Sequence, residues 1–219
     1  ILTGGLGHIG SRLLESANQS TKYIVIDSVE TQRYGSLFGT RAKSVKLIQK
    51  RVQNLDANDL VYLSNAKAIV HLAATTDATS TVDNPTVVES NNVAATKAVI
   101  DLALHLNLPV VFPSTTSVYG QQDSLVDEQC RDLRPQSPYA KSKIVEEQLL
   151  IEAGAAGLRF VIFRFGTISG PSKGMRFHTA VNKFCWQTVN GQKVTVWKTA
   201  LNQKRPYLSL LDAENAIQW

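Results

Sequence analysis

Residues 3–10 read Thr3-Gly4-Gly5-Leu6-Gly7-His8-Ile9-Gly10, and this glycine-rich segment is the strongest indication of the fold. It lies between a short apolar segment, Ile1–Leu2, and a segment whose apolar residues recur at helical spacing, Ile9–Asn18. The stretch therefore joins a predicted strand to a predicted helix. Glycines at such a junction let backbone N–H groups approach a phosphate at the N-terminus of the helix, because side chains there would block the approach.

An aspartate at the end of the second predicted strand adds to this pattern. The strand Tyr23–Asp27 is apolar up to its last residue, and Asp27 follows Gly7 by twenty residues. A carboxylate there can accept hydrogen bonds from both hydroxyls of an adenosine ribose and repels a 2′-phosphate, so we expect NAD in preference to NADP. The alternative is a tight turn followed by a surface aspartate.

Strand-like and helix-like segments alternate over the first 165 residues or so. The predicted strands are Ile1–Leu2, Tyr23–Asp27, Val45–Ile48, Ala68–Leu72, Val110–Pro113 and Phe160–Phe165. The predicted helices are Ile9–Asn18, Ala57–Leu63, Pro85–Leu106 and Pro138–Ala153. This alternation predicts an α/β fold with a doubly wound parallel sheet, Rossmann-like, with helices on both faces.

The alternation ends after Gly170-Pro171. Beyond it, Phe177–Val189 has the pattern of a helix and Val194–Trp197 that of a short strand. We therefore predict an NAD-binding Rossmann domain over residues 1–170 and, over residues 171–219, part of a small substrate-binding lobe at the C-terminal end.

The composition is that of a globular protein, with 43% hydrophobic and 19% charged residues. The net charge of +5 mildly favours anionic partners such as nucleotides. The basic residues are scattered, so we expect no nucleic-acid binding. No apolar run approaches the roughly 18 residues that a membrane span needs, so we expect no insertion into a membrane.

The two cysteines, Cys130 and Cys185, lie far apart and lack the spacing of a metal site. We therefore expect no bound metal, and two free thiols in a reducing compartment, the cytoplasm. The sequence opens at Ile1 within an expected strand and stops at Trp219 within an expected helix. We accordingly expect a chain that is truncated at both ends.

Tyr139 and Lys143 are a candidate proton-transfer pair. They are four residues apart on the helix that begins after Ser137-Pro138, so they share one face. A nearby ammonium stabilises phenolate and lowers the pKa of a tyrosine, which can then take a proton from a substrate hydroxyl. Taken alone, this spacing fits a solvated Tyr and Lys on an exposed helix better than it fits a catalytic pair.

Thr115 shifts that balance toward a catalytic pair. It lies at the end of the fifth predicted strand, and the carboxyl ends of parallel strands form the ligand crevice of such sheets. A hydroxyl there can hold the reacting oxygen between Tyr139 and a cofactor. The alternative is a β-branched residue that merely ends a strand.

Taken together, these motifs resemble the NAD-dependent epimerase/dehydratase family, the extended branch of the short-chain dehydrogenase/reductases. The order and spacing of the motifs make the resemblance specific, although each motif alone is not. The residues that carry it are Thr3–Gly10, Asp27, His71-Leu72-Ala73-Ala74, Asn92, Ser114–Gly120, Ser137–Lys143, Arg164, Gly170-Pro171 and Lys204-Arg205-Pro206-Tyr207.

The resemblance implies roles for individual residues. The implied catalytic residues are Thr115, Tyr139 and Lys143. The implied NAD-binding residues are Gly4, Gly7, His8, Ile9, Gly10, Asp27, Leu72, Ala73, Ala74, Asn92, Tyr139 and Lys143. The implied substrate-binding residues are Thr115, Thr116, Thr167 and Arg205, with Arg205 on the substrate diphosphate and just ahead of a strand.

The resemblance also implies an activity and a partner. We expect a nucleotide-sugar epimerase that uses bound NAD for transient oxidation of a sugar hydroxyl. We expect a homodimer formed through the helices Pro85–Leu106 and Pro138–Ala153, as the family suggests. Two alternatives remain: a net NAD-dependent oxidoreductase acting on a nucleotide sugar or related alcohol, and a catalytically inactive NAD-binding regulator.

Several positions depart from the family pattern. Thr116 and Ser117 stand where 4,6-dehydratases carry an Asp-Glu pair, and Ser117 also stands where decarboxylating relatives usually carry Glu, so both reactions are disfavoured. Thr167 replaces the substrate-binding Asn of the family, which puts the usual nucleotide-sugar contacts in doubt. Arg51 stands near the position of an adenine-contacting Asp, so adenine recognition is expected to differ.

Overall fold

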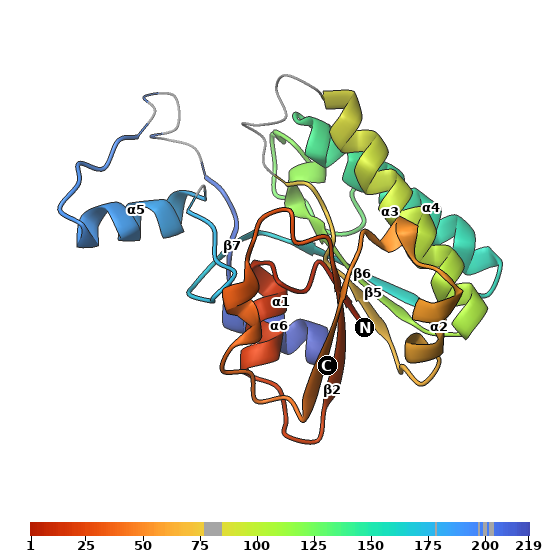
Figure 1. Cartoon of the computed structure of the whole chain (residues 1–219). Coiled ribbons are helices and arrows are strands. Elements are labelled where there is room, and N and C mark those ends of the chain that lie inside the picture. The colour runs from red at the N-terminus through yellow and green to blue at the C-terminus, as the bar shows by residue number, and fades with distance from the viewer. Residues whose placement is uncertain (77–84, 178, 197, 199–200, 202–203) are drawn as a thin grey trace.

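The computed structural model describes residues 1–76, 85–177, 179–196, 198, 201 and 204–219 (Figure 1). Its main feature is a six-stranded sheet in which every neighbouring pair of strands is parallel. In spatial order the strands are β3 (Ser44–Gln49), β2 (Lys22–Asp27), β1 (Leu2–Thr3), β4 (Ile69–His71), β5 (Val110–Thr115) and β6 (Phe160–Phe165). This order is that of a Rossmann sheet, and it confirms the predicted doubly wound fold.

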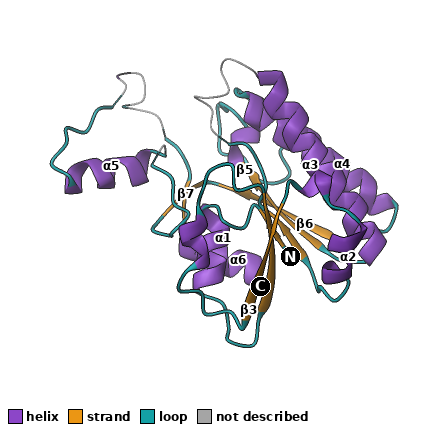
Figure 2. Cartoon of the chain, in the orientation of Figure 1, coloured by secondary structure: helices purple, strands orange, loops and turns teal. Residues whose placement is uncertain are grey.

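Helices cover both faces of the sheet (Figures 1 and 2). On one face, α1 (His8–Glu15) lies beside α6 (Leu210–Gln218), and Nε of Arg12 is 2.6 Å from Oε2 of Glu214. On the other face, α3 (Pro85–Leu106) and α4 (Pro138–Ala155) pack side by side, and α2 (Ala57–Leu63) joins the same apolar layer. Three short 3-10 helices, Tyr34–Leu37, Val52–Asn54 and Thr116–Val118, complete this part of the fold.

The core consists of two apolar layers, one on each face of the sheet. Alternation along β2 shows how a strand feeds both: Val25 packs with Leu13 and Leu14 of α1, whereas its neighbour Ile26 packs in the layer beneath α3 and α4. Full burial of each such side chain contributes about 1.5–3 kcal/mol relative to exposure. The two layers hold the carboxyl ends of the strands in fixed relative positions.

The predicted elements of residues 1–165 match the structure closely, and the differences have local causes. Helix α1 ends three residues before the predicted Asn18, because the Asn18 side chain accepts hydrogen bonds from the backbone and hydroxyl of Ser20 and forms a turn. Strand β5 continues two residues past Pro113. Beyond Val111, β5 pairs only with β6, so the missing N–H of Pro113 is tolerated.

The region after Gly170 differs more from the prediction. A helix is present but shorter, α5 (Ala180–Val189), and it stands away from the sheet (Figure 1). The strand predicted at 194–197 is wrong for residues 194–196, because no strand among the described residues pairs with them; Trp197 lies outside the described residues. Instead, β7 (Thr167–Ser169) pairs in parallel with β8 (Tyr207–Ser209).

The chain then returns to the main sheet through α6, which packs on α1. The division into a Rossmann domain and a substrate lobe at residue 170 stays a prediction. No helix in the described ranges combines the length and apolar character that a bilayer span requires.

Candidate active site

Two adjoining cavities lie at the carboxyl ends of the strands. The larger, of about 620 Å³, lies over β1, β2 and β4, and the smaller, of about 300 Å³, lies over β4, β5 and β6. The chain reverses its direction of winding between β1 and β4, which is where such sheets bind ligands. The two cavities share a wall made of Gly4, Gly7, Arg33, Leu72, Ala74, Thr76 and Arg176.

The three expected phosphate-loop glycines have three different structural roles. Gly4 has a φ of +64°, and a Cβ there would lie 2.7 Å from the backbone of Ala73. A Cβ on Gly10 would lie 2.4 Å from the carbonyl oxygen of Gly5, so Gly10 permits close packing within the loop. Only Gly7 has an open face, since a Cβ there would meet a single atom at 3.2 Å. Gly7 is therefore the glycine that leaves room for a ligand.

The start of α1 is suited to an anion. Gly7 is its N-cap and provides no side-chain capping bond, and the first turn contains no acidic residue. The first N–H groups of the helix therefore remain available to a phosphate. His8, Ile9 and Gly10 line the smaller cavity at this point. The loop and helix together fit the pyrophosphate of a dinucleotide.

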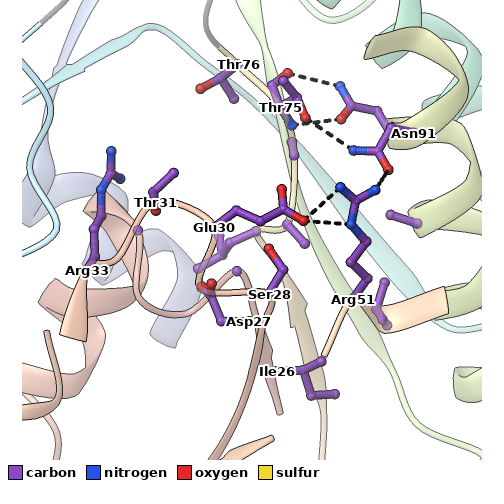
Figure 3. Close-up of a pocket in the computed structure, with 18 of the residues that line it drawn as sticks. Ile26, Asp27, Ser28, Glu30, Thr31, Arg33, Arg51, Thr75, Thr76 and Asn91 are labelled. Carbon is purple, nitrogen blue, oxygen red and sulfur yellow. Dashed lines mark hydrogen bonds and ion pairs between the residues drawn. The ribbon is translucent and has the colours of Figure 1, made fainter. Parts of the chain in front are cut away.

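Asp27 lies in the larger cavity with its carboxylate held in place (Figure 3). Oδ2 accepts a hydrogen bond from the N–H of Leu6 at 3.1 Å, and Oδ1 accepts one from the N–H of Val29 at 2.9 Å. Each carboxylate oxygen can accept a further bond. The position fits the predicted contact with the ribose hydroxyls of NAD.

Arg51 is bound at the far end of the same cavity (Figure 3). Its Nη2 lies 2.7 Å from Oε1 of Glu30, and its Nη1 donates to Oδ1 of Asn91 at 3.0 Å. Gln53 donates to the same amide oxygen at 3.2 Å. These contacts connect the ends of β2 and β3 to α3 where the adenine of a dinucleotide is expected.

The segment after β4 forms part of the wall that the two cavities share. Leu72 and Ala74 line both cavities, and Ala73 and Asn92 line the larger one. The buried amide of Asn92 accepts from the N–H of Thr75 at 2.8 Å and donates to the carbonyl oxygen of Thr75 at 3.2 Å. Asn92 therefore fixes the shape of this wall in addition to facing the cavity.

Tyr139, Lys143 and Thr115 come together in the smaller cavity. Helix α4 begins at Pro138, and its N-cap Ser137 accepts a hydrogen bond from the N–H of Ala140, which sets Tyr139 in the first turn as predicted. The Lys143 side chain is only 4% exposed, and its ammonium lies 5.9 Å from the centroid of the Tyr139 ring. The alternative of a solvated Tyr and Lys pair is therefore wrong.

The surroundings of Tyr139 shift the pKa of its phenol in opposite directions. Burial raises the pKa of the Tyr139 phenol above its usual value, the charge of Lys143 lowers it, that of Glu146 raises it and that of Arg176 lowers it again. Lys143 itself is paired, with its ammonium 3.1 Å from Oε2 of the fully buried Glu146. The basicity of the phenol thus depends on its burial and on three charged neighbours, Lys143, Glu146 and Arg176.

A buried chain of hydrogen bonds lies behind Lys143. Oε2 of Glu146 accepts from the hydroxyl of Thr96 at 2.8 Å, and that hydroxyl lies 3.1 Å from Nε2 of His71. Nδ1 of His71 lies 2.7 Å from the hydroxyl of Thr3. Burial, followed by the charge of Lys143, lowers the pKa of His71 to about 3, so the ring is neutral. Because Thr96 donates to the carboxylate, His71 must donate from Nε2 and accept at Nδ1.

The four predicted substrate contacts do not all reach the cavity. Thr115 and Thr167 line the smaller cavity, and Oγ1 of Thr115 accepts from the N–H of Ser117 at 3.2 Å, which leaves its own O–H to donate. Thr116 is not among the residues that line either cavity. Arg205 is exposed ahead of β8 and is not among them either.

Sequence reasoning missed three charged residues of the site. Glu146 follows Lys143 by three residues on the same helix, and the spacing rule for helical ion pairs indicates such a contact. Arg33 and Arg176 line both cavities, but no local pattern marks either of them. A fourth missed residue, Glu147, is bound by Arg164 at 2.7 Å and by the hydroxyl of Ser114, and so ties α4 to β5 and β6.

Comparisons with known proteins agree with this geometry. Residues 1–219 match the family described as "NAD dependent epimerase/dehydratase family". A UDP-glucose 4-epimerase of Azospirillum brasilense is 30% identical over 174 residues, which are 78% of this chain and 49% of that protein. An uncharacterized UDP-glucose epimerase of Bacillus subtilis is 31% identical over 201 residues, which are 85% of this chain and 62% of that protein.

A solved structure shows the same fold. It is that of a UDP-N-acetylglucosamine 4-epimerase from Methanobrevibacter ruminantium M1, with a TM-score of 0.87 and 23% identity, covering 99% of this chain and 70% of that one. The present chain thus spans 49% and 62% of the lengths of the two curated relatives named above.

Proposed function

Because this chain belongs to the NAD-dependent epimerase/dehydratase family, we propose that it carries the NAD site and the acid/base residues of a nucleotide-sugar epimerase. One observation carries the proposal most directly. The cavity that holds Tyr139, Lys143 and Thr115 shares a wall with the cavity that holds Asp27, and the phosphate loop forms part of that wall. A single dinucleotide can therefore reach from Asp27 to Tyr139.

The described residues fit NAD at each part of that path. Asp27 presents a braced carboxylate to the ribose, and the uncapped start of α1 faces the pyrophosphate over the open face of Gly7. Lys143 faces the smaller cavity, where the nicotinamide end belongs. NAD, when bound, supplies a hydride acceptor beside the substrate carbon.

The residues of this chain supply the other half of the reaction. Tyr139, as phenolate, takes the proton of the substrate hydroxyl, and the ammonium of Lys143 stabilises that phenolate. The free O–H of Thr115 donates to the reacting oxygen and holds it in place. Return of the hydride to the opposite face of the same carbon, together with return of the proton by Tyr139, would complete the cycle without net oxidation.

Particular observations weigh against the alternatives. An inactive regulator does not require Tyr139 and Lys143 to face one cavity, as they do here. A dehydratase needs an acid/base pair after Thr115, whereas this chain has the hydroxyls of Thr116 and Ser117. Both curated relatives named above are UDP-glucose epimerases, which supports a UDP-sugar as the first substrate to test.

The proposal includes a compartment and an oligomeric state. The two cysteines are free thiols, which suits the cytoplasm. The adjoining helices α3 and α4 expose Leu104, Val145 and Ile151, and these apolar side chains support a homodimer formed through this pair of helices. Light scattering at micromolar concentration tests the dimer, and a monomeric mass would contradict it.

The activity is tested in two steps on the purified protein. Mass spectrometry of the ligands that it retains should find NAD. Turnover is then followed with a panel of UDP-, GDP- and dTDP-sugars, with product separation to detect a changed stereocentre. We expect an epimer without accumulation of free NADH. Failure to turn over any nucleotide sugar would favour the inactive regulator, and stoichiometric release of NADH would favour the net oxidoreductase.

A further inference from the structure

Two arginines, Arg33 and Arg176, form part of the wall that the two cavities share, and the proposed reaction gives neither of them a role. Arg33 follows β2, and Arg176 comes from the segment between β7 and α5. Both are partly buried, and both line the larger and the smaller cavity. Figure 3 shows Arg33 on the side of the larger cavity away from the Arg51–Glu30 pair. The phosphate loop, through Gly4 and Gly7, lines the same wall.

Close packing and hydrogen bonds hold both arginines near the phosphate loop. The segment 170–176 lies against that loop so closely that a Cβ on Gly174 would be 2.4 Å from the carbonyl oxygens of Leu6 and Gly7. The N–H of Gly174 donates to the buried hydroxyl of Ser11 at 2.9 Å. Nη1 of Arg33 donates to the carbonyl oxygen of Gly174 at 3.1 Å. The position of Arg33 is thus tied to the segment that carries Arg176.

The same segment is fastened to the start of α1 at two further points. The hydroxyl of Ser172 donates to the carbonyl oxygen of His8 at 2.8 Å, and Nε2 of His8 lies 2.8 Å from the carbonyl oxygen of Gly170. Arg176 donates from Nη1 to the hydroxyl of Thr76, and both residues line both cavities. The segment that carries Arg176 is therefore fixed against the start of α1.

Neither arginine forms an ion pair with a carboxylate of the described residues. Over the described residues, no carboxylate lies within 4.0 Å of either guanidinium group, and the first turn of α1 contains no acidic side chain. Burial lowers the pKa of Arg33, and the charge of Arg176 lowers it further, whereas Asp27 raises it. Burial likewise lowers the pKa of His8, and after the opposing bond from Gly170 the charges of both arginines lower it again.

We propose that Arg33 and Arg176 form a clamp that binds a diphosphate group at the phosphate loop. The inference rests on the proposed function, because it assigns further residues to the same ligand site. Two partly buried cations beside an uncapped helix N-terminus favour the binding of an anion with more than one negative charge. Each guanidinium group uses one nitrogen for a contact within the protein, Arg33 with Gly174 and Arg176 with Thr76, so its other nitrogens can donate to phosphate oxygens.

A diphosphate can come from two sources at this wall. One is the pyrophosphate of the dinucleotide, which lies between the Asp27 end and the Tyr139 end. The other is the diphosphate of a nucleotide sugar in the smaller cavity, which both arginines also line. ADP-ribose carries the first group without nicotinamide, and UDP carries the second without a sugar, so the two sources can be separated by titration.

The test uses calorimetric titration of the whole chain with ADP-ribose, UDP and adenosine. The variants are Arg33→Met, Arg176→Met and the corresponding Lys variants, with Arg41→Met as a control that removes the same charge from an exposed site. We expect each Met variant to weaken ADP-ribose, UDP or both by about tenfold or more, since each loses charge-assisted hydrogen bonds to phosphate. Adenosine affinity and the affinities of the control should stay unchanged, and the Lys variants should recover part of the loss.

Each outcome decides the proposal. Weakening of ADP-ribose alone supports a clamp on the cofactor, and weakening of UDP alone supports a clamp on the substrate. Unchanged affinities for both ligands in folded Met variants would overturn the clamp and leave the proposed function standing. An equal loss of adenosine binding would overturn it too, because the defect would then be structural. A wild-type protein that binds neither ADP-ribose nor UDP would overturn both the clamp and the proposed function.

If the Met variants do not fold, the salt dependence of wild-type binding tests the clamp instead. We then expect the affinities for ADP-ribose and UDP to fall more steeply with salt than the affinity for adenosine, and an equal dependence for all three would contradict the clamp.

Discussion

The ammonium nitrogen of Lys143 lies 3.1 Å from Oε2 of Glu146, and the two side chains are 4% and 0% exposed. The pair is held from behind, because Glu146 also accepts from Thr96 at 2.8 Å. Its second oxygen, Oε1, is buried without a hydrogen-bond partner in the described part of the chain. A carboxylate in this position offsets the positive charge that Tyr139 needs in order to act as a base.

The first prediction is that Glu146→Gln lowers the pKa of Tyr139. Burial raises that pKa, Lys143 lowers it and Glu146 raises it, so removal of the carboxylate charge leaves the lowering by Lys143 less opposed. The phenolate is the active base, and its activity is lost as the pH falls through its pKa. We therefore expect the acid limb of the kcat profile to move to lower pH. Glu152→Gln on the exposed face of α4 is the control, and an unmoved or upward-shifted limb in Glu146→Gln would count against the prediction.

The second prediction is that Tyr139→Phe abolishes nearly all turnover and leaves NAD binding intact. The substitution deletes only the phenol hydroxyl, and the ring still fills its place beside Lys143. Loss of proton transfer should reduce kcat by about 10²–10⁴-fold. Steady-state kinetics and a fluorescence titration of NAD measure the two effects, and Tyr62→Phe on the exposed face of α2 is the control. Wild-type turnover in Tyr139→Phe would show that another group is the acid/base.

The third prediction concerns stability, through Lys143→Met. Loss of the ammonium leaves Glu146 as an uncompensated buried charge, which typically costs about 3–5 kcal/mol. The double variant Lys143→Met/Glu146→Gln removes that charge and should recover much of the loss. Denaturant unfolding measures the free energy of each variant. NAD affinity should fall in both, since both lack the ammonium in the cavity. Equal stability of the single and double variants would contradict the account of the pair.

The fourth prediction is that the protein binds NAD⁺ more tightly than NADP⁺. Two backbone N–H groups, those of Leu6 and Val29, hold the Asp27 carboxylate in the larger cavity, where it repels a 2′-phosphate. Asp27→Asn removes this repulsion and should reduce the preference for NAD⁺ over NADP⁺. Calorimetric titration with each cofactor checks this, with Glu30→Gln as a control that removes another carboxylate from the same cavity. Equal or tighter NADP⁺ binding by the wild type would refute the assignment.

The fifth prediction is that Gly174→Ala destabilises the protein and weakens its hold on ADP-ribose. The added Cβ would lie 2.4 Å from two carbonyl oxygens of the phosphate loop, so the segment must move away from Ser11 and Arg33. Overpacking of this kind costs about 1–3 kcal/mol. Thermal unfolding and titration measure both effects. Gly35→Ala, where an added Cβ meets no atom within 4 Å, is the control. A variant that melts like the control would contradict the predicted close contact.

Most of the fold could be predicted because its signals are local. The β-branched runs and the helical spacing identified the six strands and the first four helices, and errors were confined to element ends such as Asn18. The small sheet of β7 and β8 could not be predicted in this way. Each of its strands is three residues long, and the first residue of β7, Thr167, pairs with Tyr207, which lies forty positions later in the sequence. Strands so short carry no periodicity of their own.

Local sequence is sufficient to identify the phosphate loop, the acidic end of β2 and the shared face of Tyr139 and Lys143. Each depends on residues within one turn, one strand or one helix, where backbone geometry fixes the spacing. Long-range packing sets which charges surround Tyr139, which atom Arg33 binds and how the roles of the three glycines differ. Arg33 meets Gly174 across 141 positions of sequence, and Gly4 is confined by the backbone of Ala73 on a neighbouring strand's loop. Such contacts follow from how the sheet brings distant segments together, and no local pattern specifies them.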